Sequence, residues 1–228
     1  MVQVFERLSR STLREQIVEK MKTAILTGAL REGDRLVERR LVAKFETSLT
    51  VVREALLELE TEVFVSKKTN AATYVTKLSM EAAEKIFSVR KVLERFAVEE
   101  AARLASVKQV QRLEAAYLEL LDTARTHNAQ LFILKDLALH EAMWQITANE
   151  YLEAVLHRTI HPIFAVTAIR ILSCHPFDLL QDAYSHLPTI EAVKARNSAV
   201  AREVFLNAVD DWLSKTRNYV FGQPEDSR

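Results

Sequence analysis

The sequence predicts a mainly α-helical protein in two parts: a short N-terminal part with three helices and two strands, and a longer part that is helical throughout. Only three glycines and four prolines occur in 228 residues, which favours long helices over sandwiches and barrels. From Ser79 to about Val220, apolar residues recur at helical spacing almost without interruption. Hydrophobic residues make up 49% of the chain, enough to bury a core, so the composition excludes a disordered protein.

The first helix is predicted from signals at both of its ends. Thr12 and Glu15 have the spacing of a capping box and stand directly ahead of an apolar series with helical spacing. Gly28 follows that series at the position where a C-terminal cap is expected. Together these signals predict a helix over about 12–27.

Two further helices follow closely. The turn REGD at 31–34 leads to a short helix near 38–45, and a third helix is predicted over about 48–61. The third helix has one face for burial, formed by Val52, Ala55, Leu56 and Leu59. Ser48, Thr50 and Arg53 lie off that face, where they suit a phosphate or a base edge, or else ordinary capping and solvent.

Two short strands complete the first part. VFVS (63–66) and TYVT (73–76) alternate as strands do, with the polar turn KKTNAA between them. Three helices and a two-stranded hairpin in this order are typical of a winged helix-turn-helix. Residues 1–77 carry 14 Lys and Arg against 11 Asp and Glu, whereas 78–228 carry 17 against 20. This sign suits a nucleic-acid module attached to an acidic domain.

The second part is predicted to be an all-α bundle of six or seven helices. Breaks in the periodic pattern place the helices at about 79–104, 107–126, 129–147, 150–172, 177–195 and 198–220. We therefore expect a winged helix-turn-helix domain over 1–77, a helical domain over 78–221 and a disordered tail over 222–228.

Cysteine usage and hydropathy indicate where the protein works. The single Cys174 excludes an intramolecular disulfide framework and fits a reducing compartment. No apolar run reaches ~18 residues, and MVQVFERLSR has charges where a signal peptide needs an apolar stretch. We expect a soluble, cytoplasmic protein with no membrane partner.

In the order of these parts, the chain resembles a GntR-superfamily transcription regulator of the FadR subfamily, with the helical ligand-binding domain called FCD. The N-terminal resemblance rests on AILTGALREGDRLVERRLVAKF, VREALLELE and the hairpin ending in YVTKLS. The C-terminal resemblance rests on RKVLERFAVEEAARLA (90–105), DLALHEAMWQITANEYL (136–152) and HLPTIEAVKARN (186–197). It covers nearly all of 10–220 and implies a homodimer that binds a palindromic double-stranded DNA operator and senses a small carboxylate effector.

The resemblance implies DNA contacts by Arg39, Arg40, Ser48, Thr50, Arg53 and Asn70. Hydroxyls at a helix N-terminus suit phosphate oxygens, arginines suit phosphates or guanine edges, and asparagine tolerates a left-handed turn. The chain departs from the family pattern at Leu49 and Leu57, where basic residues are usual, and at Val63, where glycine is usual. Ala71 and Ala72 replace the Arg–Gly of the wing tip, so operator specificity does not carry over.

A divalent metal site is predicted in the second part. Asp136 and His140 are four residues apart, so both side chains leave one helix face and are able to converge on one ion. The FCD resemblance places a further ligand at His186. A carboxylate and neutral imidazoles suit Zn²⁺, Mn²⁺ or Ni²⁺, so we expect one divalent ion per subunit and no organic cofactor. The alternative is a buried Asp–His pair that binds no metal.

The predicted metal site lacks one ligand of the family pattern. Where the family usually has a third histidine, this chain has Ala208, so Asn207, Asp211 or the effector carboxylate would have to complete the coordination sphere. The remaining histidines carry no ligand prediction individually; they are His127, His157, His161 and His175.

Arg90 and Glu94 are also four residues apart, on the first helix of the second part. One interpretation is an ion pair on the helix surface that contributes ~0.3–0.5 kcal/mol. The other, which the resemblance favours, assigns both residues to the effector site. Arg90 would then anchor the effector carboxylate, because a planar guanidinium binds a carboxylate through two hydrogen bonds.

The sequence therefore predicts a dimeric, ligand-responsive transcription regulator, in the first instance a repressor, with no catalytic residues. One alternative is a metal-dependent helical enzyme in which Asp136, His140 and His186 leave coordination positions open for substrate. No general base or nucleophile accompanies these three residues. The other alternative is a sensor of the same fold that has lost operator binding through Leu49 and Ala72.

Overall fold

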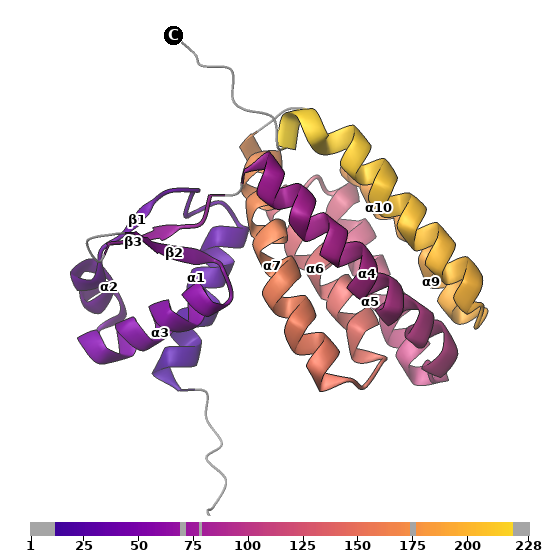
Figure 1. Ribbon diagram of the computed structural model, residues 1–228, viewed down its shortest axis with the longest axis horizontal. Coiled ribbons are helices and arrows are strands. Elements are labelled where there is room, and N and C mark those ends of the chain that lie inside the picture. Colours follow the sequence, from indigo (N-terminus) through magenta and orange to yellow (C-terminus); the bar gives the residue numbers. More distant parts are fainter. Residues whose placement is uncertain (1–11, 69–71, 78, 174–176, 221–228) are drawn as a thin grey trace, which may run out of the picture.

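The computed structural model describes residues 12–68, 72–77, 79–173 and 177–220. It has two halves that lie side by side (Figure 1). Three helices and a small sheet form one half, and the described helices α4 to α10 form the other. The predicted fold class, a winged helix-turn-helix followed by a helical bundle, is confirmed, and the bundle has seven helices within the described residues.

The winged half begins with three helices packed around a small core, α1 (Leu13–Leu26), α2 (Glu38–Phe45) and α3 (Leu49–Thr61). Thr12 caps α1 as predicted: the Glu15 N–H donates to Thr12 Oγ1 at 3.2 Å, and the Thr12 N–H donates to Glu15 Oε2 at 2.9 Å. The apolar faces of α1 and α3 are buried, formed by Ile17, Val18, Met21, Ile25, Val52, Ala55, Leu56 and Leu59. This core holds α3 in place.

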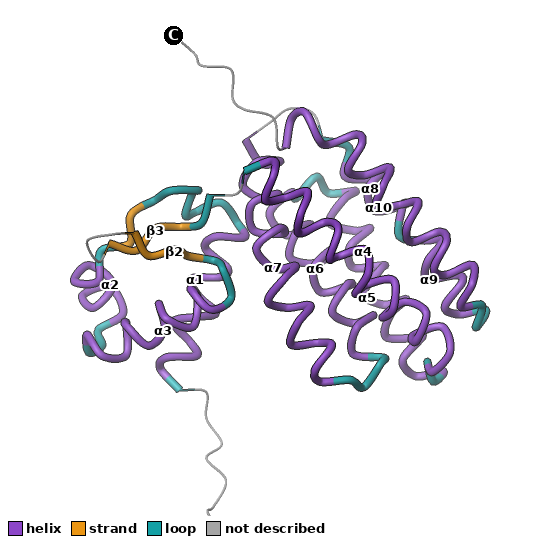
Figure 2. Tube along the Cα trace, viewed as in Figure 1, coloured by secondary structure: helices purple, strands orange, loops and turns teal. Residues whose placement is uncertain are grey.

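The wing is a three-stranded antiparallel sheet in the order β1–β3–β2 (Figure 2). Its strands are β1 (Arg35–Leu36), β2 (Val65–Lys68) and β3 (Ala72–Val75). In the register of β2 and β3, Val65 is opposite Val75. The sequence predicted the hairpin but placed its first strand at 63–66, two residues too early. It also missed β1, because two residues are too few to show alternation.

The helical half comprises α4 (Met80–Leu104), α5 (Val107–Arg125), α6 (Ala129–Gln145), α7 (Glu150–Ser173), α8 (Leu179–Ser185), α9 (Leu187–Lys194) and α10 (Ser198–Val220). The single helix predicted over 177–195 is wrong, because the chain forms α8 and α9 there. Pro188 has no N–H to donate to the carbonyl of Tyr184, so the hydrogen-bond ladder is interrupted at His186.

The described residues leave some predictions without a structural counterpart. Asn70, Cys174 and the predicted tail 222–228 lie outside them. The predicted domain boundary between residues 77 and 78 lies between β3 and α4 and stays a prediction. No helix in the described part of the chain is long and apolar enough to cross a membrane.

Val63 adopts a backbone conformation that L-residues rarely take. Its φ is +64°, in the left-handed region, at the position after the C-cap of α3. The Phe64 N–H donates to the Leu59 carbonyl at 2.9 Å, and the Val63 N–H donates to the Glu60 carbonyl at 3.0 Å. This is a Schellman ending, which normally has glycine at the left-handed position. This left-handed conformation explains why the family usually has glycine at this position.

We expect Val63→Gly to stabilise the protein by about 1 kcal/mol, because a side chain with Cβ is strained in the left-handed region. The Val63 side chain is exposed, so its removal forfeits little burial. The measurement is the free energy of unfolding in urea. Val63→Ala is the matched control, since it keeps a Cβ and should recover only part of the gain. A glycine variant no more stable than wild type contradicts this account.

Candidate functional site

The predicted DNA-binding residues that the structure describes lie on α2 and at the start of α3. Arg39, Arg40, Ser48, Thr50 and Arg53 are all exposed. α2 and the beginning of α3 lie at the end of the winged half farthest from helices α4 to α10 (Figure 1). The five side chains are therefore accessible to a large partner such as a duplex.

Two of these residues also make contacts within the chain. The Val51 N–H donates to Ser48 Oγ at 3.3 Å, so Ser48 is the N-cap of α3. Arg53 Nε donates to Glu38 Oε2 at 2.9 Å, although 62% of the Arg53 side chain stays exposed. Capping thus occupies the Ser48 oxygen, and the ion pair occupies Nε of Arg53. The Ser48 hydroxyl hydrogen and the Arg53 terminal nitrogens remain suited to phosphate or base contacts.

The winged half also carries exposed basic residues that were not among the predicted DNA contacts. Lys44 near the end of α2 and Lys67 and Lys68 on β2 are exposed. Leu49 and Leu57, which stand where basic residues are usual, are exposed at 39% and 63%. Because they lie four residues on either side of Arg53, the exposed face of α3 is more apolar than the family pattern implies.

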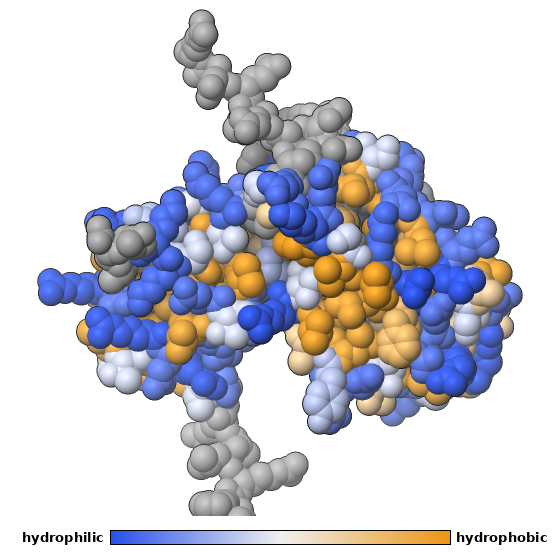
Figure 3. Space-filling view, in the orientation of Figure 1, coloured by the Kyte–Doolittle hydropathy of each residue, from blue (hydrophilic) through white to orange (hydrophobic). Residues whose placement is uncertain are grey.

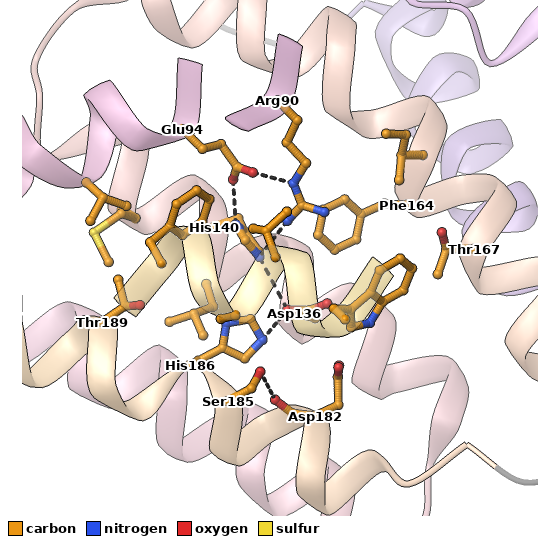
Figure 4. Close-up of a pocket in the computed structure, with 18 of the residues that line it drawn as sticks. Arg90, Glu94, Asp136, His140, Phe164, Thr167, Asp182, Ser185, His186 and Thr189 are labelled. Carbon is orange, nitrogen blue, oxygen red and sulfur yellow. Dashed lines mark hydrogen bonds and ion pairs between the residues drawn. The ribbon is translucent and has the colours of Figure 1, made fainter. Parts of the chain in front are cut away.

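A pocket lies inside the helical half, with a cavity of about 90 Å³. Its charged and titratable side chains come from α4, α6, α8 and the α8–α9 junction (Figure 4): Arg90, Glu94, Asp136, His140, Asp182 and His186. Aromatic rings form much of the remaining wall, from Phe87, Phe132, Trp144, Phe164, Phe177, Phe205 and Trp212. The pocket therefore combines a polar centre with apolar walls, as small-molecule sites do.

The structure brings the three predicted metal ligands together. One ligand atom each from Asp136, His140 and His186 lies within 4.8 Å of the other two. Asp136 Oδ1 is 3.1 Å from His186 Nε2 and 3.8 Å from His140 Nε2. That oxygen is buried but has no partner in hydrogen-bond geometry among the described residues. The three atoms thus face a common point, and an Asp and two imidazoles are a donor set that suits a divalent transition metal.

The electrostatics of this centre show closely balanced charges. Burial alone would raise the pKa of Asp136, but His186, together with His140 and Arg90, outweighs burial and lowers it. Burial alone would lower the pKa of His186, but Asp136 raises it. Asp182 differs, because burial and the nearby Asp136 carboxylate raise its pKa to about 7. Asp182 is therefore the pocket carboxyl whose neighbouring cations do not offset its burial.

Asp182 is the pocket carboxylate that sequence reasoning missed. Ala208 does line the pocket and supplies no ligand. The proposed substitutes are elsewhere: Asn207 is exposed, and Asp211 pairs with Lys215 at 2.6 Å on the outside of α10. A signal for Asp182 was present, because it precedes His186 by four residues, the same spacing as Asp136 and His140.

Glu94 makes the densest set of contacts in the pocket. Its side chain is 1% exposed and accepts from Arg90 Nε through one oxygen. Its other oxygen lies 2.7 Å from His140 Nδ1 and 3.1 Å from Trp144 Nε1. The interpretation of Arg90 and Glu94 as a surface ion pair is therefore wrong: the pair is buried.

Glu94 also fixes the orientation of His140. Because Nδ1 donates to the carboxylate, Nε2 is left with its lone pair toward Asp136 and the centre of the pocket. A histidine ligand held by an outer carboxylate in this way is common in metal sites. With both oxygens engaged, Glu94 is suited to positioning His140 and Arg90 more than to contacting an effector directly.

Arg90 presents the rest of its guanidinium to the cavity. Its Cζ lies 5.5 Å from the ring centroid of Phe87 and 5.6 Å from that of Phe164, which limits its movement. One terminal nitrogen is 3.4 Å from His140 Nε2. Since Nε is held by Glu94, the terminal nitrogens are the atoms suited to a ligand carboxylate.

The Glu94 contacts predict an acid-sensitive stability. Burial alone would raise the pKa of Glu94, but Arg90 and His140 outweigh it and lower the pKa from 4.5 to about 2. A carboxyl whose pKa is lower in the folded than in the unfolded protein stabilises the folded state at pH values above its unfolded pKa. That stabilisation is lost as the pH falls from the unfolded pKa through the folded pKa. We therefore expect roughly 3 kcal/mol of wild-type stability to disappear between about pH 5 and pH 2.

Glu94→Gln tests this by urea unfolding at a series of pH values, because the glutamine cannot ionise. The difference in unfolding free energy between wild type and variant should shrink as the pH falls. Glu81→Gln is the matched control on the same helix, since Glu81 is an exposed residue paired with Lys85. A difference at Glu94 that does not vary with pH contradicts the account.

Comparisons with known proteins agree with this architecture. The family profile described as bacterial regulatory proteins, gntR family, matches residues 13–75, and the FCD domain profile matches residues 85–211. Among solved structures, E. coli McbR/YncC superposes with a TM-score of 0.82 at 19% identity, covering 92% of this chain and 99% of that one. A putative GntR regulator from Rhodococcus sp. RHA1 gives 0.77 at 17% identity, covering 94% and 100%.

Curated relatives of similar length are also regulators. The chain is 22% identical over 219 residues to the gluconate operon transcriptional repressor of Bacillus subtilis, covering 95% of this chain and 90% of that protein. It is 24% identical over 216 residues to a probable D-xylose utilization operon transcriptional repressor of Paenarthrobacter nicotinovorans, covering 92% of each. These relatives and the two family profiles describe transcription regulators and not enzymes. The chain is a member of the gntR family of bacterial regulatory proteins, a transcription regulator that joins a winged-helix DNA-binding domain to an FCD domain.

Proposed function

We propose that the protein is a dimeric repressor that binds a palindromic operator and changes its operator affinity when a small carboxylate enters the FCD pocket. The observation that carries this proposal is the convergence of Asp136, His140 and His186 beside the Arg90 guanidinium in one pocket. A cavity of this composition is suited to binding an anion, and it belongs to the same chain as an exposed, basic recognition face.

A divalent metal ion would lie at the centre of the pocket. Its protein ligands would be Asp136 Oδ1, His140 Nε2 and His186 Nε2. Asp136 Oδ1 makes no hydrogen bond although His186 Nε2 lies 3.1 Å away, and the pKa of the neighbouring Asp182 is raised. Both observations support a cation here, because a cation would neutralise the two part-buried carboxylates. When bound, the metal would act as a Lewis acid that accepts a ligand carboxylate.

The effector class follows from the pocket's chemistry and size. The terminal nitrogens of Arg90 suit one carboxylate, and a cavity of about 90 Å³ admits only a compact molecule. Thr189, Ser185 and Thr167 on the wall offer hydroxyls to a polar ligand. The relatives named above regulate gluconate and D-xylose operons, so sugar-derived hydroxy acids are the first compounds to screen.

Dimerisation would bring two recognition helices to two half-sites. Figure 3 shows an apolar patch over α4 and α7, and the exposed apolar residues of these helices include Val89, Val92, Phe96 and Val155. The three α4 residues have the spacing of one helix face. A second copy packed on this patch would link the two DNA-binding domains through their FCD domains, which strengthens binding beyond that of one domain.

We expect Arg53→Ala to weaken operator binding by ~1–3 kcal/mol if Arg53 contacts a base, and to reduce the salt dependence if it contacts a phosphate. The measurement is a gel shift on the protein's own promoter region at several salt concentrations. Arg112→Ala, which removes an exposed arginine from α5, is the matched control. Equal affinities for Arg53→Ala and Arg112→Ala exclude Arg53 from the interface, and no shift by wild type favours the sensor without operator binding.

We expect His186→Gln to carry one divalent ion fewer per subunit than wild type, because it removes one of three protein ligands. Its melting temperature should also gain less from added Zn²⁺, Mn²⁺ or Ni²⁺, since the metal binds only the folded state. Elemental analysis and thermal shift give the two readouts. His127→Asn, at an exposed histidine between α5 and α6, serves as the control. If His186→Gln and wild type have identical metal content, the alternative of a buried Asp–His pair that binds no metal is the better account.

Effector binding and operator binding should change together. Typical coupling of ~1–3 kcal/mol alters operator affinity roughly 5- to 150-fold, and DNA must alter effector affinity by the same factor. Arg90→Lys keeps the buried charge beside Glu94 but loses the paired N–H geometry, so it should weaken both responses while the protein stays folded. A carboxylate that stabilises wild type but not Arg90→Lys, and leaves the gel-shift midpoint unchanged, contradicts regulation through this pocket.

A further inference from the structure

A second group of potential metal ligands lies outside the pocket, between α6 and α7. It consists of Glu141 on α6 and of His157 and His161 on α7. The two histidines are four residues apart and so leave one face of α7. Glu141 directly follows His140 in α6, yet its side chain does not line the pocket. The cluster is therefore a separate feature of the helical half.

The three ligand atoms form a tight triangle. Glu141 Oε1 lies 2.9 Å from His161 Nε2 and 3.4 Å from His157 Nδ1, and the two ring nitrogens are 2.7 Å apart. Two ligands of a tetrahedral zinc ion, bound at 2.0–2.1 Å, are about 3.3 Å apart. The edge between the two ring nitrogens thus has to open by about 0.6 Å and the edge from Glu141 to His161 by about 0.4 Å, while the third edge already fits such an ion.

When both rings are neutral, no placement of hydrogens gives all three of these atoms a good hydrogen bond. If His161 Nε2 carries hydrogen, that hydrogen has to serve His157 Nδ1 and Glu141 Oε1 together. If His157 Nδ1 carries it instead, His161 Nε2 directs a lone pair at the carboxylate 2.9 Å away. With hydrogens on both nitrogens, two N–H groups oppose each other at 2.7 Å. One divalent cation would engage all three atoms at once.

The surroundings of the cluster resemble those of a built metal site. His157 Nε2 is 3.5 Å from Glu153 Oε1, so a carboxylate lies on the outer side of the ring while Nδ1 faces inward, as in many metal sites. His161 is 7% exposed, whereas 31% of the His157 side chain and 28% of the Glu141 side chain are exposed. An ion could therefore enter from solvent and keep a water as its fourth ligand.

The cluster also lies where the two halves of the protein meet. The His161 ring contacts the ring of Phe64 edge-on, with centroids 6.0 Å apart. Phe64 is buried and forms the second position after the C-cap of recognition helix α3. Figure 1 shows α7 as the bundle helix next to the winged half. An ion at this cluster would hold the ring against which the end of α3 packs.

We propose that Glu141, His157 and His161 form a second divalent-metal site, selective for zinc-like ions, at the junction of the two domains. Two imidazoles and one carboxylate are donors that prefer Zn²⁺ or Co²⁺ to Mg²⁺ or Ca²⁺. This site does not depend on the proposed effector pocket, since the two share no ligand.

The test uses full-length, EDTA-stripped protein carrying His186→Gln, so that the pocket site is disabled. Zn²⁺ titration by calorimetry should give one equivalent of bound ion, and Co²⁺ should give the visible absorption of a four-coordinate site. Adding His157→Gln or Glu141→Gln should remove that equivalent. Both residues are part-exposed, and circular dichroism checks that the variants fold. Glu153→Gln should weaken binding about 10- to 100-fold without abolishing it.

The control is His127→Asn in the same background, which should keep the equivalent. Anomalous scattering at the zinc edge should place the ion between α6 and α7. Unchanged Zn²⁺ affinity in both His157→Gln and Glu141→Gln, or no anomalous peak between these helices, overturns the second site. Failure of the pocket metal would appear differently, as equal metal content in wild type and His186→Gln.

Discussion

The buried carboxylate of Glu94 is the interaction on which the geometry of the helical half depends. It accepts from Arg90, four residues along α4, and from His140 and Trp144 on α6. A carboxylate buried this deeply is tolerable only because several charged or polar donors surround it. Removing one partner would leave an uncompensated charge in the core, which typically costs ~3–5 kcal/mol. These contacts therefore lock α4 and α6 in one relative position.

The same contacts also fix the side chains that line the pocket. Glu94 accepts from Nε of Arg90 and from Nδ1 of His140. The terminal nitrogens of Arg90 and the lone pair of His140 Nε2 are then left to the pocket. The positive charge that Glu94 neutralises is replaced in part by His186, whose pKa the Asp136 carboxylate raises. A pocket with fixed donors needs little reorganisation to receive a ligand, and such preorganisation increases affinity.

Much of the fold followed from the sequence because its signals are local. The predicted helix 38–45 agrees with α2, and the capping box at Thr12 agrees with the start of α1. Two errors of element assignment have local causes as well: β1 is too short to show a pattern, and Pro188 divides a helix whose apolar period continues across it. Periodicity alone does not report a missing N–H.

The site was less predictable, because pairs four residues apart are frequent on any helix. The spacing of Arg90 and Glu94 was visible in the sequence, but their burial depends on helices packed from elsewhere in the chain. The Asp182–His186 and His157–His161 pairs carry the same spacing and were passed over, since nothing local distinguishes a buried face from a solvated one. The left-handed Val63 was recognisable only as a departure from the family pattern, and its φ explains why glycine is usual there.

The contacts around Trp144 connect the pocket to the recognition helix. Its indole N–H donates to Glu94, and its ring lies 5.5 Å from His157 and 6.5 Å from His161, centroid to centroid. His161 in turn packs on Phe64, directly after α3. Contiguity alone does not transmit a signal, because coupling requires an element with two arrangements that both sites bias. The α6–α7 cluster is such an element if its ligand atoms either share protons or bind an ion. On the two proposals above, an effector in the pocket would bias this element through Trp144, which donates to Glu94 and lies against both His157 and His161.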